Sequence, residues 1–321
     1  MPAALWVRMM NVMKSLLTAS VAMTLAVTGC VRQDANPTSD IDKALPTSAQ
    51  VKINLPQSGQ TRTIGALATY YLVTRDATVT FNGGSAWVLT LIHAIVQYPV
   101  TSVSGDVYTW GPWSDALDPA EYKLDVTANT DGTFDYSLSG RNKTVAGSQF
   151  EMVITGHADP TPGELQGNGE FFIDFDASKR VDPIDNANAK GSVDARYDLK
   201  AKHLDLHIMS TDDNNSPVAA DYAYEQGADG SGDMTFDVQG NAGGTALLED
   251  MTIRSRWTAN GSGRGDARVT GGDLGTVQAI ASECWGTDFR RSYYTDNVNF
   301  QATEGDAATC AYADVDLPPA H

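Results

Sequence analysis

Short segments that alternate apolar and polar residues make up most of the chain from Ser104 onward. Gly, Asn, Asp or Pro residues separate these segments, which are YKLDVTA, TFDYSLSG, QFEMVITGH, GEFFIDFD, SVDARYDL, HLDLHIM, AADYAYEQ, DMTFDVQ, EDMTIRSRW and RGDARVTG. Alternation with a period of two predicts strands with one buried face, and short polar connections favour antiparallel pairing. ANTDG, residues 128–132, is typical of a hairpin turn. We therefore expect about ten strands in an antiparallel meander.

Residues 61–100 have a different pattern, which predicts helices. Five apolar residues there have helical spacing: Ile64, Leu67, Ala68, Tyr71 and Leu72. The segment that follows, DATVTF at residues 76–81, alternates instead and is compatible with a strand. A second helix is predicted for AWVLTLIHAIVQY, residues 86–98, with Ser85 as its cap and Pro99 after its end.

The second predicted helix is apolar nearly all round, so it belongs in a core rather than on a surface. Its 13 residues are too few to cross a bilayer, which takes roughly 20. His93 within it is interpreted as a core histidine whose polar atoms are satisfied. Together these patterns predict an α+β fold, mainly β. We expect a long curled, half-barrel-like antiparallel sheet with the N-terminal helices packed on or in its concave face. Residues 61–100 and 101–317 are expected to form one domain.

The N-terminus has the features of an export signal. The run LLTASVAMTLAV, residues 16–27, follows Arg8 and Lys14, and no acidic residue precedes Asp34. A run of about 12 apolar residues suits a signal peptide and is too short for a membrane span.

Val27-Thr28-Gly29-Cys30 resembles the lipobox of bacterial lipoproteins. The resemblance implies cleavage before Cys30, so residues 1–29 are a signal peptide, and diacylglycerol on the Cys30 sulfur. It also implies an anchor in the cell envelope, and Val31, in place of Asp, favours the outer membrane. The alternative is an ordinary signal peptide with a cysteine nearby by chance. Residues 30–60 are polar and contain three prolines, so they are expected to form a flexible tether.

Charge and cysteine content limit the possible partners. The formal net charge is −18, and it becomes −20 when Arg8 and Lys14 are lost with the signal peptide. Such a surface repels nucleic acid and anionic lipid headgroups, so the bilayer is expected as a partner only through the Cys30 anchor. With Cys30 lipidated, Cys284 and Cys310 remain, and an oxidising compartment favours a disulfide between them. Free thiols are the alternative.

Two segments invite a metal hypothesis, and both have a simpler interpretation. DFDASKRVDPID, residues 174–185, has oxygen-bearing side chains at several positions of an EF-hand-like loop. It has Lys179 where the EF-hand needs Gly, so we interpret it as a solvated acidic loop between two strands. His203, Asp205 and His207 share one face of a strand, which a wet sheet face explains without zinc. No metal and no cofactor are predicted.

Two aromatic segments are candidate contacts for a ligand or partner. Trp110 and Trp113 in WGPW could stack on a ring, although such residues more often cover the edge of a core. Trp285, Arg290 and Arg291 lie in SECWGTDFRRSYYTD, the densest aromatic and basic cluster of an acidic chain. An anionic partner would bind there, unless Asp288 and its neighbours compensate the arginines locally. RGD at residues 264–266 is set aside as a chance match.

These observations predict an exported, lipid-anchored protein of the cell envelope that acts by binding or structural association. One alternative is a carrier of a lipid or another hydrophobic ligand. The carrier would require Trp87, Leu91, Ile92 and Ile95 to cover the mouth of the sheet rather than fill it. The second alternative is a hydrolase, although no catalytic residues are identified. An envelope protein is the other possible partner, and the sequence leaves the oligomeric state open.

Overall fold

The computed structural model describes residues 54–56, 67–83, 92, 95–96, 98–114, 116–161, 163, 166–211, 217–240, 247–299 and 301–319. The chain divides into two compact units: unit 1 contains described residues 54–81 and 209–319, and unit 2 contains described residues 82–208. The signal peptide, Cys30 and most of the tether lie outside the described residues, as do Trp87, Leu91 and His93. The single-domain organisation of residues 61–317 stays a prediction.

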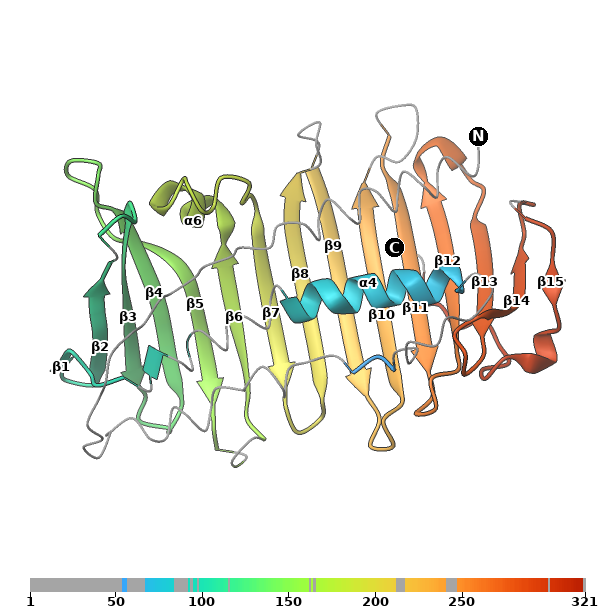
Figure 1. Cartoon of the computed structure of the whole chain (residues 1–321), viewed down its shortest axis with the longest axis horizontal. Coiled ribbons are helices and arrows are strands. Elements are labelled where there is room, and N and C mark those ends of the chain that lie inside the picture. The colour runs from blue at the N-terminus through green and yellow to red at the C-terminus, as the bar shows by residue number, and fades with distance from the viewer. Residues whose placement is uncertain are drawn as a thin grey trace. The chain divides into compact units, whose positions relative to one another are not determined.

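The described residues form fifteen antiparallel strands, which follow one another in sequence order in one unclosed sheet from β1 to β15 (Figure 1). The first eight are β1 Ser102–Ser104, β2 Val107–Trp113, β3 Ala120–Ala128, β4 Phe134–Asn142, β5 Glu151–Asp159, β6 Asn168–Asp174, β7 Ser192–Asp198 and β8 His203–Thr211. The others are β9 Pro217–Gln226, β10 Gly232–Gly240, β11 Glu249–Trp257, β12 Gly263–Gly271, β13 Ala279–Trp285, β14 Arg291–Asp296 and β15 Glu304–Gly305. The predicted mainly β, α+β fold with a long antiparallel meander is confirmed.

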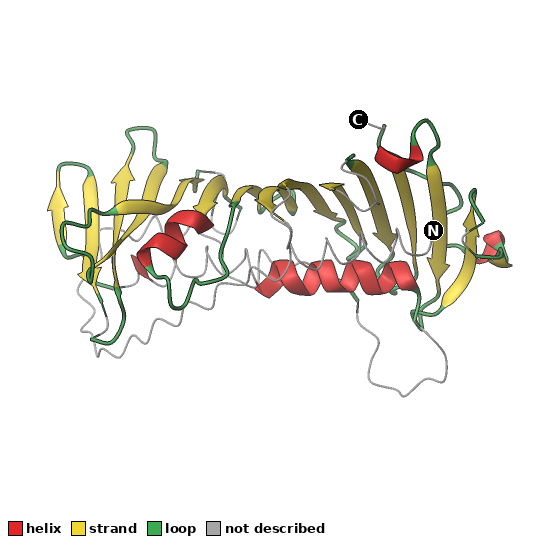
Figure 2. Ribbon diagram, turned by 90° about the horizontal axis from the view of Figure 1, so that it is seen from above, coloured by secondary structure: helices red, strands yellow, loops and turns green. Residues whose placement is uncertain are grey.

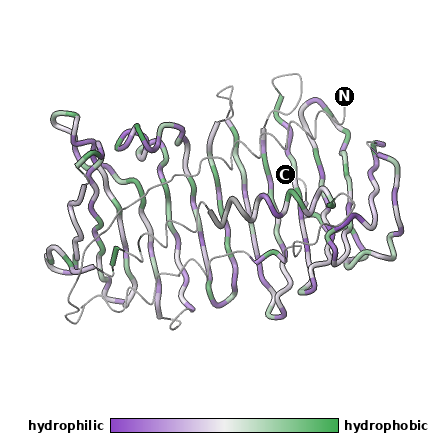
Figure 3. The backbone as a smooth tube through the Cα atoms, viewed as in Figure 1, coloured by the Kyte–Doolittle hydropathy of each residue, from purple (hydrophilic) through white to green (hydrophobic). Residues whose placement is uncertain are grey.

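The core of each unit consists of side chains at alternate positions along the strands. In β3, Ala120, Tyr122, Leu124 and Val126 are buried, and the residues between them are half-buried. Figure 3 shows the same alternation of apolar and polar residues along the strands. The period of two that predicted the strands therefore also selects the residues of the buried face.

Helix α6, Phe175–Val181, follows β6 in unit 2 and contacts β4 and β5. Asp174 caps this helix, because its Oδ1 accepts a hydrogen bond of 2.7 Å from the backbone N–H of Ala177. The buried Asp182 follows the helix and accepts from the N–H groups of Ile184 and Asp185. The interpretation of residues 174–185 as a loop is therefore wrong for residues 175–181, which are helical, whereas the segment does lie between two strands and its Asp176 and Asp185 are exposed.

Helix α4, Thr69–Gly83, packs on one face of the sheet in unit 1 (Figures 1 and 2). Tyr70, Thr74 and Thr78 are buried at helical spacing, and Thr74 Oγ1 donates to Ser255 Oγ of β11 at 2.6 Å. The prediction that residues 76–81 could form a strand is wrong. The alternation was misleading because Thr78, counted as polar, lies on the buried face of the helix.

The second predicted helix, residues 86–98, lies largely outside the described residues. Ile92, Ile95 and Val96 within it are helical and buried, in agreement with its interpretation as a core helix. None of the described helices combines the length and the apolar character that a bilayer crossing requires.

Aromatic side chains cover glycines on neighbouring strands in both units. A Cβ atom built on any of these glycines would overlap the facing ring. The directly opposed pairs are Tyr122–Gly140, Tyr136–Gly156, Tyr197–Gly169, Trp257–Gly232 and Trp285–Gly263. The glycines let large rings lie flat on the sheet, an arrangement known to stabilise glycine in strands.

At least four hairpin turns share one five-residue conformation, at residues 129–133, 227–231, 258–262 and 286–290. In each turn the first N–H donates to the fifth carbonyl, and the fourth N–H donates to the first carbonyl. The fourth residue has positive φ and is Gly in three turns, whereas Phe289, with φ 62°, takes this place in the last turn. The Phe289 ring packs against Tyr71 of α4 with a centroid distance of 4.6 Å, which offsets the strain of its backbone.

Candidate functional site: the arginine face

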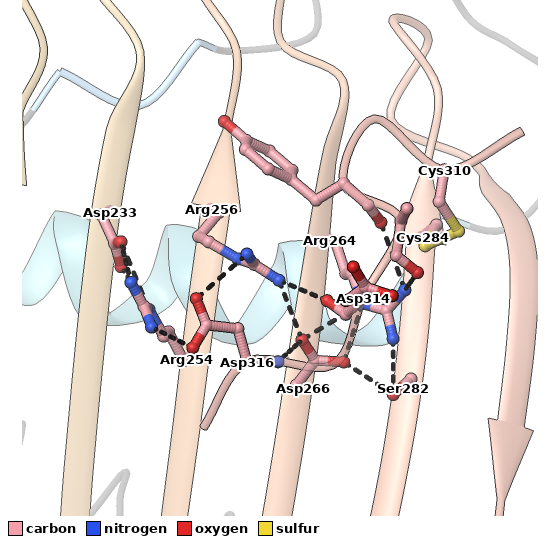
Figure 4. Close-up of polar contacts among 12 residues, drawn as sticks. Asp233, Arg254, Arg256, Arg264, Asp266, Ser282, Cys284, Cys310, Asp314 and Asp316 are labelled. Carbon is pink, nitrogen blue, oxygen red and sulfur yellow. Dashed lines mark hydrogen bonds and ion pairs between the residues drawn. A yellow bond between two sulfur atoms is a disulfide. The ribbon is translucent and has the colours of Figure 1, made fainter. Parts of the chain in front are cut away.

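Four arginines of β11 and β12 lie on the face of the unit 1 sheet opposite α4. We call this set the arginine face; it comprises Arg254, Arg256, Arg264 and Arg268. Side chains on a strand alternate between faces, so Ser255 and Gly265 point toward α4 while the arginines point away from it. In Figure 4, α4 passes behind the strands and the side chains of Arg254, Arg256 and Arg264 lie in front.

Asp266 lies at the centre of the arginine face. Its side chain is 0% exposed. Arg264 Nε donates to it at 2.8 Å, Ser282 Oγ donates at 2.6 Å, and Arg256 Nη2 lies 3.3 Å away. Arg256 and Arg264 stand directly opposite each other in the β11–β12 register, where like charges are destabilising. A buried carboxylate between the two guanidinium groups reduces that repulsion.

The C-terminal strap, residues 311–319, crosses the arginine face. It begins after Cys310, whose disulfide with Cys284 of β13 confirms the predicted pairing. Carbonyl oxygens of the strap accept hydrogen bonds from three arginines: Tyr312 and Ala313 from Arg264 Nη1 at 3.2 and 2.9 Å, Asp314 from Arg256 Nη2 at 2.8 Å, and Pro318 from Arg268 Nη1 at 2.6 Å. The arginines thus hold the strap largely by its backbone (Figure 4).

Asp316 gives the strap its carboxylate contact with the arginine face. Its two oxygens lie 2.7 Å from Arg254 Nη1 and 3.3 Å from Arg256 Nη1. Its backbone N–H donates to Asp266 at 3.3 Å. The Tyr312 ring packs under Arg256, with 4.8 Å between the guanidinium carbon and the ring centroid, and burial raises the pKa of its hydroxyl. The strap therefore combines carbonyl, carboxylate and aromatic contacts.

Carboxylates from the sheet and from the strap form ion pairs on the arginine face. The carboxylates that form ion pairs with these arginines are Asp233, Asp266 and Asp316. The hydrogen bond from Arg254 to Asp233 raises the pKa of that guanidinium further. Arg256 Nε is buried and has no hydrogen-bond partner among the described residues. Guanidinium groups stay protonated and donate several hydrogen bonds in a fixed plane, so this face is suited to binding carbonyls and carboxylates rather than to proton transfer.

Trp285 lies in the core of unit 1, whereas Arg290 and Arg291 are half-buried. Trp285 is buried, and its Nε1 donates to the Gly261 carbonyl at 3.0 Å. Arg291 Nε donates to the buried Glu283 at 2.5 Å, and Arg290 Nε lies 3.8 Å from Asp288. Local charge compensation therefore accounts for this cluster better than an anionic partner.

Trp110 and Trp113 lie in β2 of unit 2, on either side of a cis Gly111–Pro112 peptide bond. Trp110 is buried and donates from Nε1 to the Tyr98 carbonyl at 2.8 Å, while Trp113 is half-buried. This placement agrees with the interpretation that the two tryptophans cover the edge of a core.

The two segments considered for metals have internal partners. In β8, His203 Nε2 lies 2.9 Å from Asp205, and the alternate residues Leu204 and Leu206 are buried, as the pattern predicted. Among the described residues, no group of three or more His, Cys, Asp or Glu side chains is arranged to hold a metal ion.

The arginine face was missed at the sequence level because RGD was treated as a motif match. The usable signal was alternation: Arg254 and Arg256 are two apart, as are Arg264, Asp266 and Arg268, which places each set on one face of its strand. Two adjacent strands that both place arginines on one face, in a chain of net charge −18, indicate an arginine cluster with a specific role.

Comparison with known proteins gives no relative for this chain: no family model, no curated protein and no solved structure matches it.

Proposed function

We propose that this protein is exported, lipid-anchored through Cys30 in the bacterial cell envelope, and acts by binding or structural association. The observation that carries the proposal is the disulfide between Cys284 and Cys310. Disulfides persist in oxidising compartments such as the periplasm. Of the three cysteines in the sequence, the pairing leaves Cys30, which ends the lipobox-like segment.

The anchor and the tether would define the working position of the protein. Two or three acyl chains bind a bilayer stably, at about 0.8 kcal/mol per buried methylene. A flexible tether of about 30 residues has an average span of roughly 30 Å. Val31 favours the outer membrane as the site of anchoring. The folded part would then stand clear of the membrane surface and meet an envelope protein as its partner.

Binding is a better match than catalysis to the arginine face. The guanidinium groups are directed hydrogen-bond donors. In the strap they bind peptide carbonyls and a carboxylate, which accept these hydrogen bonds. In unit 1, α4 occupies the apolar face of the sheet through Thr74 and Ser255, which favours a filled core over a ligand cavity there.

A carrier function remains the second candidate because of two tyrosines in unit 2. The hydroxyls of Tyr136 and Tyr197 are buried without a hydrogen-bond partner among the described residues. Burial raises the pKa of both hydroxyls. An unsatisfied buried polar group costs about 1–3 kcal/mol, and a bound apolar molecule with a hydrogen-bond acceptor would recover that cost.

Membrane fractionation of the native host or a bacterial expression host tests the anchor. The full-length protein should enter the membrane fraction, and mass spectrometry should find an acylated N-terminal Cys30. Cys30→Ala should leave the protein in the soluble fraction, while Cys284→Ala should stay with the membrane. An unmodified Cys30 in a soluble protein would disprove the anchor.

Native mass spectrometry of the exported protein tests the carrier candidate. A copurified adduct of several hundred daltons, lost on denaturation, would support it, and Tyr136→Phe with Tyr197→Phe should weaken retention of the adduct. A clean mass for the wild-type protein would favour the binding role of the arginine face.

A further inference from the structure

We infer that the arginine face is a binding site for an extended acidic segment of another protein, and that the C-terminal strap is an internal ligand that occupies it. This inference rests on the proposed binding role and names the chemical class of the partner. It follows from how the strap is held, from what the strap leaves unsatisfied, and from the charge of the whole protein.

The contacts of the strap are ones that many acidic peptides could make. Carbonyl oxygens receive the arginine hydrogen bonds, and Asp316 adds a carboxylate between Arg254 and Arg256. The apolar side chain of Val315 contributes little to this binding, since it is 49% exposed. A site that recognises backbone carbonyls and one carboxylate can accept other extended chains with the same two features.

The strap does not satisfy the site completely. Arg256 is only 13% exposed, and its Nε atom lacks a hydrogen-bond partner among the described residues. Arg256 also faces Arg264 directly across the β11–β12 ladder. A segment with a second carboxylate near Arg256 would bind its guanidinium fork with two hydrogen bonds, the geometry that arginine and carboxylate prefer.

Charge favours an acidic segment over other occupants. Arginines are concentrated on this face of a chain whose net charge is −18. The field of the remaining surface disfavours large polyanions such as nucleic acid, whereas a short acidic peptide makes close contact with this one face. Removing the strap would also remove the Asp316 carboxylate from its contacts with Arg254 and Arg256.

The strap is attached to the fold by the Cys284–Cys310 disulfide just before it. A tethered ligand acts at an effective concentration on the order of millimolar. A partner segment must therefore compete with the strap, and the complete protein should bind it more weakly than a protein without the strap. This competition is the property that the experiment measures.

The test compares the exported full chain with a chain that ends at Ala311, which keeps both cysteines of the disulfide. The probe is a fluorescein-labelled peptide of sequence AYADVDLPP, followed by fluorescence anisotropy. A second peptide keeps the two aspartates and replaces the other side chains by Gly and Ser, and a third replaces the two aspartates by asparagine. The shortened chain should bind the first two peptides and bind the third at least about tenfold more weakly. The full chain should bind the first peptide about tenfold or more weakly than the shortened chain does.

Matched variants assign the binding to the arginine face. Arg254→Gln with Arg256→Gln in the shortened chain should abolish binding, while Arg196→Gln, at a side chain 78% exposed on β7 of unit 2, should leave it unchanged. Equal binding of the aspartate and asparagine peptides, or no binding by a folded shortened chain, would overturn the inference. Displacement of the peptide by inorganic phosphate at equal concentration would also overturn it, because the site would then bind simple anions.

If the shortened chain does not fold, the full chain with Asp316→Asn replaces it. Loss of the Asp316 ion pairs should loosen the strap and raise the affinity for the first peptide several-fold over the wild type. An unchanged affinity would overturn the inference. Membrane fractionation of Cys30→Ala is independent of these results, so failure of the peptide site and failure of the anchor are distinguishable.

Discussion

The backbone N–H of Tyr70 donates to Glu283 Oε2 at 2.5 Å, across a separation of 213 residues. The other oxygen of Glu283 accepts from Arg291 Nε at 2.5 Å. The N–H groups of the first helical turn have no partner within the helix, and the helix dipole favours a negative charge there. A carboxylate from β13 therefore supplies the N-terminal cap of α4, and it fixes the position of the helix on the sheet.

Glu283→Gln is expected to destabilise unit 1 by about 2–4 kcal/mol. The Glu283 side chain is 0% exposed, so the change removes the buried carboxylate that pairs with Arg291 and leaves a neutral amide at the N-terminus of α4. Urea unfolding followed by tryptophan fluorescence measures the loss. Glu304→Gln is the matched control, because Glu304 contacts the same Arg291 at 3.4 Å but is 55% exposed; it should cost less than about 1 kcal/mol. Equal losses for the two variants would contradict this role of Glu283.

The strands were predictable from the sequence because a period of two is a local signal. Residues 120–126 and 203–207 alternate in burial as their sequences alternate in polarity. The pairing of Glu283 with Tyr70 was not predictable in this way, since nothing local connects residues so distant. Its neighbourhood, residues 282–296, was recognised as unusual, but its charges were attributed either to an anionic partner or to local compensation, and not to α4.

The same limit explains the errors at residues 76–81 and 264–266. Thr78 has a β-branched side chain that favours a strand locally, but packing of α4 against the sheet overrides this preference. Arg264 and Asp266 appear as surface residues until β11, β13 and the strap are placed around them. Sequence alone gives the face of each residue on its strand and leaves open what covers that face.

The hairpin turn at residues 227–231 provides a pH-dependence prediction. The pKa of Asp229 is lowered first by the hydrogen bond from the Ser231 hydroxyl and then by that from the Ser231 N–H. A lowered pKa means that the stabilisation is present above the ordinary value of 3.8 and is lost as the pH falls through the folded value. Ser231→Ala should raise the pKa of Asp229 toward the ordinary value in a carboxyl NMR titration.

The turn at residues 258–262 supplies a natural control for that titration. Asn260 takes the place of the aspartate there, and its Oδ1 accepts from the Ser262 N–H at 3.0 Å and hydroxyl at 2.8 Å. Asp229→Asn should therefore keep the turn and remove its contribution to the pH dependence below about pH 4. An Asp229 pKa that does not move in Ser231→Ala would show that the hydroxyl is not the cause of the shift.

Gly232→Ala is expected to destabilise unit 1 by about 1–3 kcal/mol. The new methyl group would overlap the ring of Trp257, which is 0% exposed and cannot move aside. Thermal unfolding monitored by near-ultraviolet circular dichroism reports the loss of packing around this ring. Gly286→Ala is the control, because its Cβ would meet only the carboxylate of Asp288 at 3.2 Å. A loss as large in the control would mean that the ring is not responsible.

Replacing both Cys284 and Cys310 by serine should lower the stability of the oxidised protein by about 3 kcal/mol. The disulfide closes a loop with a sequence separation of 26, so its loss increases the conformational freedom of the unfolded chain. It also frees the start of the strap, and the Asp316 N–H, which donates to Asp266, should exchange with deuterium faster. Hydrogen exchange read by mass spectrometry separates the two effects. Faster exchange in the strap with unchanged exchange in β3 to β5 of unit 2 is the expected pattern. Unchanged exchange in the strap would show that the arginines alone hold it.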